Sequence, residues 1–172
     1  MLKYCLVLFV VMLMPLALHA EDVYQTPEAF IAESFDGNPP PETSFWQPDS
    51  LTADIHKIME RSYNLPRVKY WEKDGRTVWI LEEIGKVKPI TAGYVIAKDN
   101  TIERMKVLIY RESHGWEVKH DFFTDQFNGL ALKENQKLDG YVDNISGATM
   151  SVDALRNLGK LALFLHKNRG VE

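Results

Sequence analysis

Seven residues near the end of the chain place a hydroxyl nucleophile beside a predicted helix start. They read Asp-Asn-Ile-Ser-Gly-Ala-Thr over residues 143–149, and the apolar spacing that follows predicts an amphipathic helix. The first turn of a helix has unpaired N–H groups and a partial positive charge, so it stabilises a bound phosphate. Gly147 and Ala148 keep large side chains away from Thr149. These residues therefore predict a phosphate site within reach of the Thr149 hydroxyl.

The same residue types also occur at helix starts that bind no ligand. Ser, Thr and Asp are common N-caps, and each stabilises a helix by about 0.5–2 kcal/mol. Under this interpretation Thr149 only caps the final helix. Asp143, three residues before Ser146, completes a longer pattern and favours the ligand site.

The pattern Asp-x-x-Ser-Gly-Ala-Thr before a C-terminal helix resembles the flavinylation motif of the FMN-binding domain family. That family includes the FMN-bearing subunits of the sodium-pumping quinone reductase and of its electron-transport relative. The resemblance implies that FMN is joined through its phosphate to the Thr149 hydroxyl as a phosphodiester. It also implies a separate Mg-dependent flavin transferase, which takes FMN from FAD and releases AMP. Asp143 would either bond backbone amides and shape the turn, or help to hold Mg during transfer.

A second segment, residues 112–116, reads Glu-Ser-His-Gly-Trp and follows a predicted strand. It is similar to the family's Glu-Thr-Pro-Gly loop, with His114 where proline is common. The resemblance implies that backbone groups of Ser113 to Gly115 bond the polar edge of the flavin and that Trp116 packs on its ring. The alternative is a plain strand-end turn, in which Gly115 bends the chain and Trp116 fills the core.

The two segments together define the predicted site for covalent FMN on Thr149. Its cofactor-binding residues are Glu112, Ser113, Gly115, Trp116, Asp143, Ser146, Gly147, Ala148 and Thr149.

Other chemistries are poorly supported by the sequence. His114 and His120, with the carboxylates of Glu117 and Asp121, could suggest zinc. The histidine spacing fits neither one strand face nor a helical i, i+4 pair, so we predict solvated histidines and no metal. No Ser-His-Asp order or Gly-x-Ser-x-Gly frame indicates hydrolysis. The formal net charge is −4 and no cluster of Lys and Arg alternates with aromatics, so nucleic acid is a poor partner.

Residues 1–20 have the order of a secretory signal peptide. Lys3 is their only charge, residues 4–18 are largely apolar, and Ala20 precedes two acidic residues. We predict cleavage after Ala20 and a periplasmic protein. The apolar run is shorter than the roughly 20 residues of a spanning helix, and an uncleaved N-terminal anchor is the alternative. Cleavage removes Cys5, the only cysteine, and with it any disulfide or thiol chemistry.

Residues 21–66 predict two short helices without a core of their own. Thr-Pro-Glu at residues 26–28 is typical of a helix start, and a helix is expected over residues 29–35. Three consecutive prolines then predict an extended connector. A second helix is expected over residues 51–63. We interpret this segment as a helical extension of the main domain.

Residues 67–168 are predicted to form the FMN-binding domain. Asp-Gly and Asp-Asn pairs separate segments rich in Val, Ile, Tyr and Trp, which predicts two hairpins. The predicted strands are residues 68–72, 77–81, 94–97 and 102–110, and the predicted helices are residues 121–127 and 150–166. The expected fold class is α+β, with a small, largely antiparallel sheet of two hairpins packed by a C-terminal helix and an N-terminal helical extension.

These observations favour a periplasmic flavoprotein that carries FMN on Thr149 and shuttles electrons between redox partners. The expected partners are the flavin transferase and membrane or periplasmic redox proteins. No Gly-rich NAD-binding fingerprint is present, so we expect an electron carrier rather than a complete enzyme. Two alternatives stay open: a flavin-dependent reductase subunit acting on a small acceptor, and a non-redox binding module.

Overall fold

The computed structural model describes residues 21–65 and 67–170 of the chain. The predicted signal peptide, residues 1–20, lies outside the described residues. Within the described part, no helix combines the length and the apolar character needed to cross a membrane.

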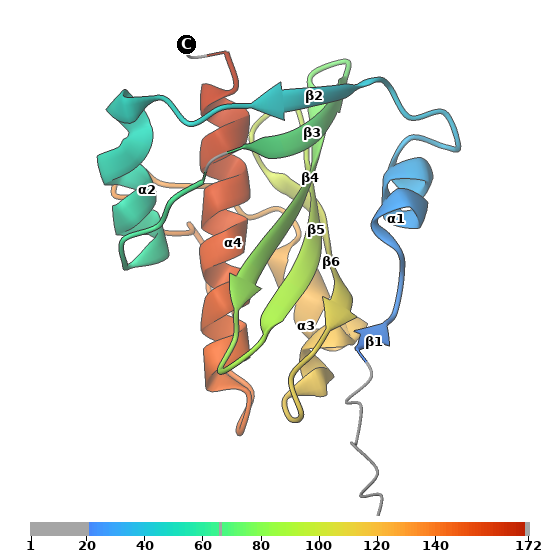
Figure 1. Ribbon diagram of the computed structural model, residues 1–172, viewed down its shortest axis with the longest axis vertical. Coiled ribbons are helices and arrows are strands. Elements are labelled where there is room, and N and C mark those ends of the chain that lie inside the picture. Colours follow the sequence, from blue (N-terminus) through green and yellow to red (C-terminus); the bar gives the residue numbers. More distant parts are fainter. Residues whose placement is uncertain (1–20, 66, 171–172) are drawn as a thin grey trace, which may run out of the picture.

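A six-stranded antiparallel sheet forms the centre of the molecule (Figure 1). Its strands are β1 (Asp22–Val23), β2 (Glu42–Phe45), β3 (Val68–Lys73), β4 (Arg76–Ile84), β5 (Pro89–Ile96) and β6 (Ile102–Tyr110). Their order across the sheet is β1-β6-β5-β4-β3-β2. Asp74 and Gly75 join β3 to β4 with φ values of 55° and 83°, as a type I′ turn requires. The expected α+β class, with antiparallel hairpins and a packing helix, is confirmed.

The two outermost strands come from the N-terminal segment, which was expected to be helical only. β1 pairs with β6, and β2 pairs with β3, so the N-terminal segment closes both edges of the sheet. Neither strand has the alternating apolar pattern that predicts a strand. In the fold, β1 is exposed throughout and β2 buries only Phe45 fully. The pairing with longer strands decides their conformation.

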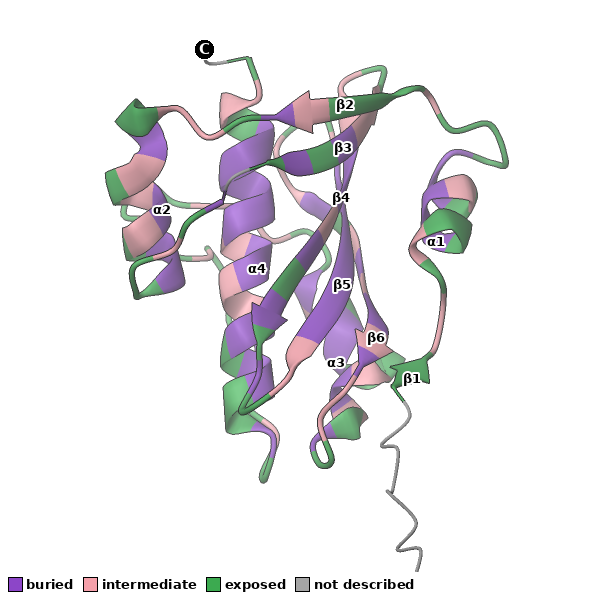
Figure 2. Ribbon diagram, in the orientation of Figure 1, coloured by how far each residue is buried: buried purple, intermediate pink, exposed green. Residues whose placement is uncertain are grey.

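Helices cover both faces of this sheet (Figure 1). They include α1 (Pro27–Ser34), α2 (Thr52–Met59) and the long C-terminal α4 (Thr149–Asn168). The buried side of α4 packs with α2 and with Trp79 and Tyr94 in the larger core, as the purple side of α4 in Figure 2 indicates. Neighbouring strand residues face the other way and meet α1, where Phe30 packs with Val78 and Val95. A Cβ atom on Gly93 would lie 2.4 Å from Phe30, so glycine lets α1 approach the sheet.

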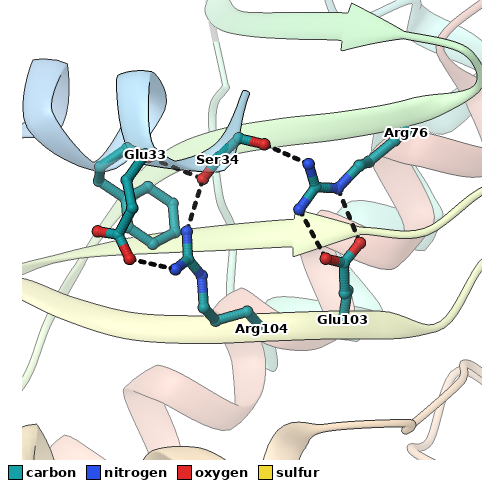
Figure 3. Close-up of polar contacts among 6 residues, drawn as sticks. Glu33, Ser34, Arg76, Glu103 and Arg104 are labelled. Carbon is teal, nitrogen blue, oxygen red and sulfur yellow. Dashed lines mark hydrogen bonds and ion pairs between the residues drawn. The ribbon is translucent and has the colours of Figure 1, made fainter. Parts of the chain in front are cut away.

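Polar contacts fasten α1 to the sheet (Figure 3). Arg104 pairs with Glu33 at 2.5 Å and donates to the hydroxyl of Ser34 at 2.9 Å. Arg76 pairs with Glu103 at 2.6 Å and also donates to the carbonyl oxygen of Ser34. Exposed ion pairs are worth only about 0–1 kcal/mol each. Burial of the apolar side of α1 therefore provides most of the attachment, and the arginines fix its position.

The second N-terminal helix ends four residues before the predicted end. A 3-10 turn, η1 (Asp49–Leu51), leads into α2, and Glu60 then adopts a left-handed conformation with φ of 57°. Beyond it, Arg61 pairs with Glu83 at 2.8 Å and the Tyr63 hydroxyl donates to the carbonyl oxygen of Glu82. Contacts with β4 thus hold residues 61–63 in a non-helical path.

Three short helical segments connect β6 to the rest of the chain. They are η2 (Trp116–Lys119), α3 (Asp121–Thr124) and η3 (Asp125–Phe127). The single short helix predicted over residues 121–127 is therefore divided in two. Val118, Phe123 and Phe127 are fully buried and anchor these segments against the larger core.

Candidate cofactor site

Both predicted segments lie at the same end of the sheet, where β6 ends and α4 begins (lower end of Figure 1). The turn between β4 and β5 reaches the same end. Together they enclose a cleft of about 780 Å³, lined by residues 86–87, 112–117 and 146–151. This volume is within the range of roughly 300–1,000 Å³ found for small-molecule sites.

All predicted site residues except Asp143 line this cleft. The sequence did not predict the wall formed by Lys86 and Val87, nor the contribution of Met150 and Ser151 to the lining. Gly85 and Pro89 indicate a turn around Lys86, but the local sequence does not show that this turn lies at the site. It reaches the site because β4 and β5 pair in register, a relationship that local patterns do not reveal.

Asp143 lies just outside the cleft and is exposed. Its backbone N–H donates to Oε1 of Gln126 at 2.7 Å, while its carboxylate has no hydrogen-bond partner among the described residues. The turn is instead shaped by Asn144, whose Oδ1 accepts from the N–H of Ile145 at 3.0 Å. Hydrogen bonding to the backbone of the turn, one of the two roles expected for Asp143, is thus performed by Asn144.

Thr149 is the first residue of α4, and Ala148 occupies the N-cap position. No side chain caps this helix, so the interpretation of Thr149 as a cap is wrong. The Thr149 hydroxyl is exposed and accepts a hydrogen bond from Nδ2 of Asn144 at 3.1 Å. Among the described residues, no acceptor takes the N–H groups of Thr149, Met150 and Ser151. This end of the helix therefore keeps the donors that favour an anion.

Gly147 opens the turn in front of these donors. Its φ of 84° lies in the left-handed region, which glycine adopts without strain. A Cβ atom at this position would meet nothing within 4 Å. Gly147 is therefore needed for its backbone conformation, and the space beside it is free for a ligand.

Ser151, which lines the cleft, forms a buried hydrogen-bonded pair with Tyr110. The Tyr110 hydroxyl donates to the carbonyl oxygen of His114 at 2.5 Å and lies 3.0 Å from Oγ of Ser151. Burial raises the pKa of Tyr110, so its hydroxyl stays protonated. Ser151 is buried and already bonded. Ser146 and Ser151 carry the other two hydroxyls near Thr149, and of these two residues only Ser146 is exposed.

Gly115 brings the two segments into contact. It has a φ of 87°, and a Cβ atom there would lie 2.8 Å from the Tyr110 hydroxyl and 3.0 Å from Cβ of Ala148. The loop after β6 and the turn before α4 can meet only because both positions carry small residues.

Glu112 connects the loop after β6 to the turn between β4 and β5. Its Oε1 accepts from the N–H groups of Lys86, Val87 and Lys88 at 2.5, 2.6 and 2.9 Å. Burial alone would raise the pKa of Glu112, but these three bonds and the charge of Lys88 outweigh it and lower the pKa. The carboxylate thus holds one wall of the cleft in place.

Trp116 stands at the rim of the cleft and does not fill the core. It is 46% exposed, and its ring meets the ring of His120 edge-on at a centroid distance of 5.5 Å. Val87 and Met150 are exposed on the other walls. The rim therefore carries three large apolar side chains that a planar ring in the cleft would cover.

The histidines near this rim do not gather with carboxylates. Within residues 21–65 and 67–170, no group of three His, Cys, Asp or Glu side chains is arranged to hold a metal ion. His120 stacks with Phe122 at a centroid distance of 6.0 Å.

Comparison with known families agrees with this geometry. Residues 85–163 match the family described as the FMN-binding domain, and the match contains all three walls of the cleft. The chain thus contains a domain of the FMN-binding domain family and is a flavin-binding protein. No curated protein matches the chain.

The residues of the cleft fit the cofactor that the family implies. The unpaired N–H groups at the start of α4 suit its phosphate, and the open space beside Gly147 gives access to them. The apolar rim of Val87, Trp116 and Met150 suits the ring system.

Proposed function

We propose that this protein is a periplasmic electron carrier that holds FMN through a phosphoester bond to the Thr149 hydroxyl. The observation that carries the proposal is the position of this hydroxyl. It is exposed, lines the cleft, and precedes three backbone N–H groups that have no acceptor among the described residues. A phosphate attached there would be stabilised by donors that are already in place.

The three walls of the cleft have separate tasks in this proposal. The start of α4 holds the phosphate, and the loop of residues 113–115 offers backbone groups to the polar edge of the ring. Trp116, Val87 and Met150 exclude water from part of the ring. FMN, when bound, supplies the redox chemistry.

An exposed rim favours a carrier that exchanges electrons by contact with other proteins. The apolar residues at the cleft mouth are about half exposed or more, so a bound ring would lie close to the surface. Covalent attachment suits a compartment outside the inner membrane, because a tethered cofactor keeps a high local concentration without a free pool. The donor and acceptor are proposed to be membrane or periplasmic redox proteins.

The test is secretion of the protein beside a flavin transferase, followed by intact mass and visible absorbance. Wild type is expected to gain the mass of one FMN phosphoester and a yellow colour, and Thr149→Ala is expected to gain neither. Ser146→Ala, which removes the other exposed hydroxyl of the turn, is expected still to gain the FMN mass, because the acceptor hydroxyl of Thr149 remains. An uncoloured wild type, or an adduct retained by Thr149→Ala, would overturn the proposal. Reduction of a small acceptor by the isolated protein would favour the reductase alternative.

A further inference from the structure

We propose that Asn144 is a positioning residue that presents the Thr149 hydroxyl for flavin attachment. The inference rests on the proposed function, because it concerns the same hydroxyl. Asn144 occupies a variable position of the motif, so the resemblance assigns it no role. In the structure its Nδ2 donates to Oγ1 of Thr149 at 3.1 Å.

The orientation of the Asn144 amide is fixed by a second bond. Its Oδ1 accepts from the N–H of Ile145 at 3.0 Å. A backbone N–H can only donate, so the amide oxygen must face Ile145 and the amide nitrogen must face Thr149. Asn144 is therefore the donor, and Thr149 Oγ1 the acceptor, in the hydrogen bond between them.

The backbone before Asn144 is held from two sides. The N–H of Asp143 donates to Gln126, which belongs to η3. Arg156 of α4 donates to the carbonyl oxygen of Val142. The Asn144 side chain thus extends from a fixed segment toward the first residue of the helix.

This arrangement leaves the Thr149 hydroxyl ready to react. A threonine near a helix start can donate its hydroxyl hydrogen to a carbonyl oxygen three or four residues earlier. Here the hydroxyl accepts from Asn144 instead, and among the described residues no acceptor takes its hydrogen. One lone pair is held by the amide, while the other lone pair and the O–H remain available.

The attachment step then balances as a phosphoryl transfer from FAD. Thr149 Oγ1 forms a bond to the phosphorus of the FMN half, and the bond from that phosphorus to the bridging oxygen breaks. AMP leaves with the bridging oxygen and its electron pair. The hydroxyl proton passes to a base of the transferase. Asn144 acts by fixing the direction of Oγ1 toward the phosphorus.

Two substitutions separate this role from support of the turn. Asn144→Ala removes both side-chain bonds. Asn144→Asp keeps an oxygen acceptor for the N–H of Ile145 but removes the N–H donor to Thr149. Asn135→Ala is the matched control, because Asn135 also accepts from a nearby backbone N–H, that of Lys137, in an exposed loop away from the cleft.

The experiment incubates each purified, unmodified protein with purified flavin transferase, Mg²⁺ and FAD, and follows intact mass with time. Both Asn144 variants are expected to attach FMN roughly tenfold to a hundredfold more slowly than wild type. The fall is expected in kcat, with an unchanged KM for FAD. The melting temperature of Asn144→Asp and the attachment rate of Asn135→Ala are expected to match wild type.

Attachment to Asn144→Asp at the wild-type rate would overturn the inference, whether or not Asn144→Ala is slow, because the turn alone would then explain the residue. If Asn144→Ala folds poorly, the attachment rate of Asn144→Asp alone tests the inference. Failure of wild type to gain FMN would instead overturn the proposed function.

Discussion

Gly115 lies against Ala148 so closely that a Cβ atom on Gly115 would lie 3.0 Å from the Cβ of Ala148. The two residues belong to segments that meet only in the folded chain, and their contact joins the loop after β6 to the start of α4. The cleft therefore depends on small residues on both sides of this junction.

Gly115→Ala is expected to destabilise the protein by about 2–4 kcal/mol, because strain at a positive φ adds to a steric clash. Gly129→Ala is the matched control, since Gly129 has a φ of 80° and nothing within 4 Å of the added carbon. It is expected to lose only about 1 kcal/mol. Urea unfolding measures both. Equal losses of unfolding free energy in the two variants would mean that the contact between residue 115 and Ala148 adjusts to the added carbon at no cost.

Tyr110→Phe is expected to destabilise the protein by about 1–2 kcal/mol, because it removes the hydrogen bonds of the Tyr110 hydroxyl to the His114 carbonyl oxygen and to Oγ of the buried Ser151. Tyr70→Phe serves for comparison, since the Tyr70 hydroxyl has no partner among the described residues. Thermal unfolding of the two variants measures the difference. A Tyr110→Phe protein as stable as Tyr70→Phe would show that the hydrogen bonds of the Tyr110 hydroxyl contribute little to stability.

Glu112→Gln is expected to lower stability at neutral pH and to change its response to acid. The three backbone bonds lower the pKa of Glu112 in the folded protein, so its stabilising contribution is present above the ordinary value of 4.5. That contribution is lost as the pH falls through the folded-state pKa. The difference in unfolding free energy between wild type and Glu112→Gln should therefore shrink between neutral pH and about pH 3. A constant difference would contradict the prediction.

His166 is expected to make the protein sensitive to mild acid. Its Nδ1 lies 2.7 Å from the Thr77 hydroxyl, and burial, with help from the charge of Arg169, lowers the pKa of His166 from 6.5 to about 4. The unfolded chain takes up a proton below pH 6.5, whereas the folded protein does so only near pH 4. Stability is therefore complete above pH 6.5 and falls as the pH drops toward 4, by about 3 kcal/mol.

His166→Asn removes this titration while keeping a polar partner for Thr77. Its unfolding free energy is expected to vary less than that of wild type between pH 7 and 4. Urea unfolding over this range provides the measurement, and parallel curves for the two proteins would count against the role of His166.

The parts of the fold that could be predicted from the sequence are those with local signals. Asp74 and Gly75 mark a hairpin because few other residues adopt left-handed φ values. The apolar spacing of α4 predicts its buried side, and the predicted start at residue 150 is one residue after the observed start at Thr149. Both segments of the cleft were predicted because each has a motif of its own.

The parts that could not be predicted depend on pairing between distant segments. β1 and β2 lack an alternating pattern, and only their longer partners make them strands. Lys86 and Val87 line the cleft because β4 and β5 pair, and Glu112 then fixes their turn. The role proposed for Asn144 could not be predicted either, because only the folded chain places its amide nitrogen 3.1 Å from the Thr149 hydroxyl.

The family match begins at residue 85, in the turn between β4 and β5, so that β4, which forms an eight-residue ladder with β5, lies outside the match. A fragment trimmed to the matched residues would lose this ladder and expose the backbone of β5. A fragment designed to carry the proposed flavin site should therefore include β4 as well as the matched residues. A fragment limited to the matched residues is expected to aggregate through the exposed edge of β5.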